Sequence, residues 1–168
     1  MNASVSHASQ ESRERLETKP PPNERAMKSK PGTYALLLRS DASTSAQIGR
    51  WGCLDVRPGY YIYVGSALGP GGVLARVSRH CREHKTKHWH IDYLRKVTIP
   101  VSVWYSYSPT RLEHCWAKAV ARLNETEAIK GFGCSDCGCN SHLFFSASEP
   151  ELHGAFAQTP GTLHHHTS

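Results

Sequence analysis

Two flanking stretches that are poor in large apolar side chains confine the foldable part of this chain to residues 31–146. Residues 1–30 contain the run Pro20–Pro22, which excludes helix and sheet, so we expect a disordered N-terminal arm there. Residues 147–168 are rich in small and polar residues and in histidine, and we expect a flexible C-terminal tail. The segment between them is long enough to close one core, so the sequence predicts a single domain.

The composition indicates a cytoplasmic protein without membrane contact. No run approaches the roughly 18 apolar residues that a membrane-spanning helix needs. The first 30 residues lack the apolar segment of a secretory signal, and their four glutamates argue against a mitochondrial transit peptide. We therefore expect the six cysteines to be reduced. The formal net charge of +6 is compatible with an anionic partner.

Three segments rich in β-branched and aromatic residues predict strands. These segments are 33–39, 60–64 and 99–107. A turn at Arg57–Gly59 separates the first two, so we expect them to pair antiparallel. Apolar residues recur with helical spacing over 73–83 and 110–123, and 143–145 is predicted as a further short strand. The sequence therefore predicts a compact α/β domain with a three-stranded, mainly antiparallel sheet flanked by helices.

Polar side chains at the margins of the two predicted helices are candidates for a functional site. Arg76 and His80 lie four residues apart at the edge of an apolar face, so their side chains stack and can reach a cleft. On the second helix, Glu113 lies beside the apolar stripe and needs a cation, a hydrogen-bond donor or a metal ion as partner. Structural roles remain open, because Arg76 could cover the core edge and Glu113 could form a salt bridge.

Residues 76–96 carry a net charge of +5 and have histidine, tryptophan and tyrosine interleaved with the basic side chains. This mixture suits contacts to phosphates and stacking on bases. An ordinary solvated surface is the alternative explanation. The candidates for nucleic-acid contact are Arg79, Arg82, Lys85 and Lys87.

A cysteine-rich segment near the end of the predicted domain offers four potential ligands, as many as a tetrahedral zinc site needs. The ligands in question are Cys134, Cys137, Cys139 and His142. Their spacing differs from that of a zinc finger, so buried structural thiols are the first interpretation, a zinc site is the second and redox catalysis is the third.

The order of these motifs resembles that of the GIY-YIG nuclease family. The motifs that carry the resemblance are, in chain order, Gly32–Tyr34, Tyr63–Gly65, Arg76 with His80, and Glu113. The runs His88–Leu94 and Gly131–Cys137 are similar to those of its small Uri-type branch. Thr33 stands where the family has isoleucine, and candidates for its late asparagine are Asn140, Ser141 and His142.

The resemblance implies a GIY-YIG-like nuclease domain over 31–146 that hydrolyses DNA phosphodiester bonds in genome maintenance, with DNA and repair proteins as partners. It also implies catalytic roles for Tyr34, Tyr63, Arg76 and His80, and Glu113 as the ligand of Mg²⁺ or Mn²⁺. A free phenol has a pKa of about 10, so either tyrosine could act as a base only beside a cation. The alternative is a non-catalytic nucleic-acid-binding or zinc-binding module with the same fold.

Overall fold

A computed structural model describes residues 27–168, so most of the arm predicted over 1–30 lies outside the described residues. The helices are α1 (Gly72–Cys81), α2 (His90–Leu94), α3 (Glu113–Ala121) and α4 (Leu152–Ala157). The strands are β1 (Gly32–Ser40), β2 (Thr44–Ile48), β3 (Gly52–Val56), β4 (Gly59–Ala67), β5 (Ile99–Ser106), β6 (Glu127–Ala128), β7 (Leu143–Ser146) and β8 (His164–Thr167). Among these residues, no helix is both long and apolar enough to cross a bilayer.

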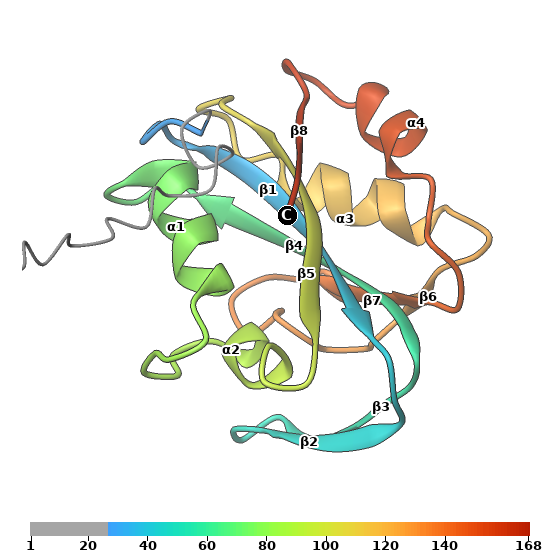
Figure 1. Ribbon diagram of the computed structural model, residues 1–168. Coiled ribbons are helices and arrows are strands. Elements are labelled where there is room, and N and C mark those ends of the chain that lie inside the picture. The colour runs from blue at the N-terminus through green and yellow to red at the C-terminus, as the bar shows by residue number, and fades with distance from the viewer. Residues whose placement is uncertain (1–26) are drawn as a thin grey trace, which may run out of the picture.

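The main sheet has six strands in the order β6-β7-β4-β1-β5-β8, and β2 pairs with β3 in a separate hairpin (Figure 1). The predicted three-stranded sheet is therefore wrong. Its three strands correspond to β1, β4 and β5 at the centre, and β1 pairs antiparallel with both β4 and β5. Strand β7 corresponds to the short strand predicted at 143–145. Strands β6 and β8 escape prediction because β6 has only two residues and β8 is a histidine tract, so tertiary pairing decides their conformation.

The central strand β1 is covered on both faces, which its continuous apolar sequence makes possible. Successive side chains of a strand point to opposite faces. Tyr34, Leu36 and Leu38 belong to a core with residues of α1, α2 and the β2–β3 hairpin. Ala35 and Leu37 belong to a second core with residues of α3 and α4. The helices and the hairpin therefore lie on two sides of one sheet.

The residues expected to form a C-terminal tail are part of this folded unit. Helix α4 packs against α3, where the rings of Phe156 and Trp116 stack with centroids 4.3 Å apart. Strand β8 pairs with β5, and His165 stacks on Trp104 with centroids 3.8 Å apart. The composition of 147–168 is misleading because its few apolar side chains complete a core that other segments supply.

Candidate functional site

A polar pocket of about 420 Å³ opens where β1, β4, α1 and α3 meet. Four of the residues implied by the family resemblance line this pocket, namely Tyr34, Tyr63, Arg76 and Glu113. Sequence reasoning did not assign the other polar lining residues to a site: Ser66, His88, His90, Arg111, Ser135 and Asp136. Side chains from segments far apart in the chain therefore converge on one cavity.

The two tyrosines stand on adjacent strands, with ring centroids 6.4 Å apart. Tyr34 of β1 pairs in register with Gly65 of β4. A Cβ atom at Gly65 would overlap the Tyr34 hydroxyl, and one at Gly32 would overlap the carbonyl oxygen of Ser106. The glycines of both tripeptide motifs therefore allow backbone and tyrosine to approach closely at the pocket.

Tyr34 is joined to a buried histidine behind the pocket. Its hydroxyl lies 2.8 Å from Nε2 of His80, and Nδ1 of His80 lies 3.6 Å from Oδ1 of Asp92. Burial lowers the pKa of His80, so its ring is neutral at pH 7. Because the Asp92 carboxylate can only accept, it favours the tautomer with the ring proton on Nδ1, in which Nε2 accepts from the Tyr34 hydroxyl. A Tyr34–His80–Asp92 chain thus leads from the pocket into the core.

Both pocket tyrosines are held in their neutral form. Burial raises the pKa of Tyr34 well above 10, and the neighbouring Tyr63 raises it further. Burial and the charge of Glu113 likewise raise the pKa of Tyr63, while Arg76 acts to lower both. Neither phenol ionises near neutral pH in the protein alone, so forming a phenolate here requires further positive charge or a proton acceptor.

The carboxylate of Asp92 is buried and collects several donors. It accepts hydrogen bonds from the backbone N–H groups of His88 and Trp89, at 2.9 and 3.2 Å. Arg79 Nη2 donates to it at 2.8 Å, and Lys85 Nζ lies 3.0 Å from its other oxygen. Burial alone would raise the pKa of Asp92, but the hydrogen bonds hold it well below the ordinary value of 3.8.

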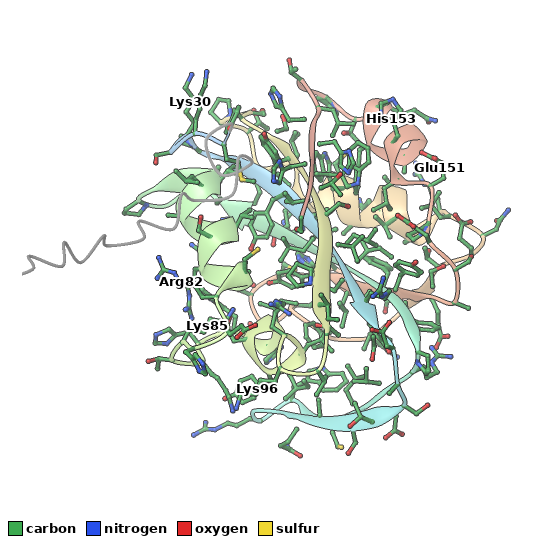
Figure 2. All side chains as sticks on the ribbon, in the orientation of Figure 1. Lys30, Arg82, Lys85, Lys96, Glu151 and His153 are labelled. Atoms are coloured by element: carbon green, nitrogen blue, oxygen red, sulfur yellow. The ribbon has the colours of Figure 1, made fainter. Side chains whose placement is uncertain are left out.

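Two of the residues predicted to contact nucleic acid, Arg79 and Lys85, form ion pairs with Asp92 instead. Side chains of Arg79 and Lys85 are only 20% and 7% exposed, and they pair with Asp92 inside the protein. Arg82 and Lys87 are exposed. Figure 2 shows Arg82, Lys85 and Lys96 around the connection between α1 and α2. Sequence reasoning could not separate the two groups because the pattern of basic residues does not show which side chains fold back onto Asp92.

Trp89 lies at the rim of the pocket between two arginines. The guanidinium carbons of Arg76 and Arg79 lie 4.3 and 4.6 Å from the centroid of its ring. Such contacts between a cation and an aromatic face restrict a long side chain that is otherwise mobile. Arg76 is therefore held in place beside the cavity that it lines.

Glu113 is the first residue of α3, where a carboxylate interacts favourably with the helix dipole. Its Oε1 lies 3.0 Å from Nδ1 of His142, a residue that is 2% exposed. Burial would lower the pKa of His142, but its hydrogen bond to Glu113 raises it. Within residues 27–168, no hydrogen bond reaches Oε2 of Glu113.

A cluster of two histidines and two cysteines lies directly behind Glu113 and could hold a metal ion. Its members are His114, Cys137, Cys139 and His142, with ligand atoms within 4.8 Å of one another. Three of the predicted ligands belong to this cluster, whereas Cys134 does not, and its Sγ donates to the carbonyl oxygen of Phe132 at 3.4 Å. The fourth position belongs to His114, which sequence reasoning missed because it lies on α3, far from the cysteine-rich segment.

The fold and the pocket define an α/β protein with a tyrosine- and arginine-lined cavity beside a His/Cys cluster. The model of the family described as the domain of unknown function DUF123 matches residues 33–164, and the chain belongs to this family. The match includes the pocket, the cluster and most of the C-terminal segment that packs on the sheet. Searches of curated proteins and of solved structures found no match.

Proposed function

We propose that this protein is an endonuclease of the GIY-YIG type that hydrolyses DNA phosphodiester bonds with the help of a divalent metal ion, in DNA repair. The observation that carries the proposal is the convergence of Tyr34, Tyr63, Arg76 and Glu113 on one pocket. These side chains provide a base, a cation for phosphoryl oxygens and a carboxylate for a metal ion. Such a set is the one that the family resemblance implies.

The residues present fit Mg²⁺ or Mn²⁺ at Glu113. Mg²⁺ keeps several waters and is commonly held by only one or two protein carboxylates. Oε1 of Glu113 lies 3.0 Å from Nδ1 of His142, and the Glu113 side chain lines the pocket. A cavity of about 420 Å³ has room for a phosphate group and waters. When bound, the ion would supply positive charge beside the scissile phosphate.

The residues of the chain itself can perform the proton transfer and stabilise the charge. Tyr34 takes a proton from the attacking water as its own proton passes to Nε2 of His80, 2.8 Å away. Asp92 stabilises the resulting imidazolium, and Tyr63 orients the water from the adjacent strand. Arg76, braced against Trp89, stabilises the negative charge that grows on the phosphoryl oxygens. Solvent supplies the proton for the leaving oxygen.

Replacing Tyr34 with phenylalanine is expected to lower the cleavage rate by about 10²–10⁴-fold, the usual contribution of a general base. DNA affinity should change by less than about twofold, because the ring and its packing remain. Single-turnover cleavage and a fluorescence binding titration measure the two quantities. Tyr60→Phe, which removes a hydroxyl outside the pocket, is the matched control and should retain full activity. Full activity of Tyr34→Phe together with an inactive Tyr63→Phe would instead make Tyr63 the base.

The proposed function itself is tested by a panel of branched, flapped, nicked, uracil-containing and abasic duplexes, incubated with Mg²⁺ or Mn²⁺. We expect cleavage of at least one duplex with metal and none after chelation. Binding without cleavage of any substrate would contradict the enzyme proposal and favour a non-catalytic nucleic-acid-binding module.

A further inference from the structure

We propose that His114, Cys137, Cys139 and His142 bind a structural zinc ion, and that this ion orients His142 so that His142 holds Glu113 in the pocket. The zinc site stands independently of the nuclease activity. Only the consequence for Glu113 rests on the proposed function.

The donor atoms have nearly the arrangement that tetrahedral zinc requires. Nδ1 of His114 lies 2.9 Å from Sγ of Cys139, and Nε2 of His142 lies 3.3 Å from Sγ of Cys137. All four ligand atoms lie within 4.8 Å of one another. With Zn–S and Zn–N bonds of ordinary length, the edges of the tetrahedron measure about 3.4–3.8 Å. Shifts of about 1 Å or less would therefore close the site around an ion.

The ligand types favour zinc over the metal proposed for the pocket. Two thiolates and two imidazoles form a borderline-soft set that suits Zn²⁺, whereas Mg²⁺ prefers carboxylate and water oxygens. The cluster holds sulfur and nitrogen donors, and the pocket side of Glu113 offers oxygen. The two neighbouring sites would thus select different metals by chemistry alone.

The ligands join a long loop to a helix. Cys137, Cys139 and His142 belong to the connection between β6 and β7, which has no helix or strand, and His114 belongs to α3. The same connection supplies Gly133, Ser135 and Asp136 to the wall of the pocket. An ion shared by the loop and α3 would hold this wall in place, because metal binding adds its free energy to folding.

His142 links the cluster to the pocket through its two ring nitrogens. Its Nε2 faces the thiols, and its Nδ1 lies 3.0 Å from Oε1 of Glu113. A metal-bound histidine commonly donates its second N–H to a carboxylate, which fixes the tautomer and the orientation of both groups. With Nε2 on zinc, Nδ1 must carry the proton and donate it to Glu113. His142 is therefore a positioning residue for the carboxylate.

Elemental analysis of the purified full-length chain tests the zinc site. We expect one zinc per chain in the wild type and none in His114→Ala or Cys139→Ser. Cys134→Ser is the matched control and should retain its zinc, because Cys134 lies outside the cluster. A variant with alanine at His164, His165 and His166 should also retain zinc, which excludes binding by that tract.

Three outcomes would overturn the site: no zinc in the wild type, loss of zinc in Cys134→Ser, or full zinc in His114→Ala. Cobalt substitution of the wild type avoids dependence on the folding of variants, and it should give tetrahedral visible bands and a thiolate charge-transfer band. Absence of the charge-transfer band would also overturn the assignment.

Nitrogen NMR of the zinc-loaded protein tests the link to Glu113. We expect a proton on Nδ1 of His142 and metal on Nε2, and a shift of the Nδ1 proton in Glu113→Gln. Coordination through Nδ1 would overturn the link. These readouts do not involve DNA, so a protein that binds zinc but cleaves nothing would refute the nuclease proposal alone.

Discussion

Replacing Glu113 with glutamine is expected to lower DNA cleavage by about 10³-fold or more, or ~4 kcal/mol of activation free energy. Glutamine keeps the shape of the side chain and an oxygen that can accept the Nδ1–H of His142, so the local structure should survive. What is lost is the negative charge that holds a divalent ion against the pocket. Single-turnover cleavage at saturating protein, titrated with Mg²⁺ and Mn²⁺, measures the effect.

The DNA affinity of Glu113→Gln should be unchanged or slightly higher, because removing a carboxylate beside a phosphate does not oppose binding. Its zinc content should equal that of the wild type. Glu125→Gln makes the same change of charge at an exposed position and should cleave normally. Cleavage at the wild-type rate by Glu113→Gln would exclude Glu113 as the metal ligand. A loss of DNA affinity as large as the loss of cleavage would assign Glu113 to DNA contact instead.

Replacing Asp92 with asparagine is expected to lower the free energy of unfolding by about 3–5 kcal/mol, the usual cost of removing one partner from a buried ion pair. Lys85 and Arg79 would keep their positive charges near the core without a counter-charge. Equilibrium denaturation by urea measures the loss. Asp41→Asn removes a carboxylate from an exposed ion pair with Arg39 and should cost less than about 1 kcal/mol. Equal losses in the two variants would contradict the role assigned to Asp92.

The same carboxylate makes the stability of the wild type sensitive to acid. Because the folded protein lowers the pKa of Asp92 below 3.8, the unfolded chain binds the proton more readily. The contribution of Asp92 is therefore complete above about pH 5 and is lost as the pH falls through about 4 and below. Between pH 6 and pH 3, the free energy of unfolding measured by urea denaturation should decrease more steeply for the wild type than for Asp92→Asn. An equal decrease in the two proteins would show that Asp92 does not take up a proton on unfolding.

Local sequence patterns predict the centre of this fold, and the sequence singles out four of the residues that line the pocket. The strands that carry Tyr34 and Tyr63 are apolar and β-rich, and β1 and β4 pair as their intervening turn predicts. Glu113 stands out because it is the sole carboxylate between Asp92 and Glu125. In each case the sequence pattern lies within a few residues of the strand or side chain that it predicts, so the prediction does not require knowledge of the tertiary structure.

The features that sequence reasoning missed depend on tertiary contacts that the local sequence pattern does not show. His114 joins the cysteine cluster only because α3 begins beside the loop before β7. Lys85 belongs to a basic run typical of a solvated surface, yet its ammonium group is buried against Asp92. Strand β8 consists of histidines that adopt an extended conformation because β5 offers them a ladder of hydrogen bonds.

The C-terminal strand shortens the exposed edge of the sheet, because β8 has four residues and covers part of the eight-residue β5. Strand β5 would otherwise be an edge, and unpaired N–H and C=O groups at an edge are a template for strands of other molecules. A chain that ended before α4 would leave this backbone open and would also uncover Trp116 beneath Phe156. Such a shortened chain would be prone to self-association and aggregation, even though every residue of the pocket would still be present.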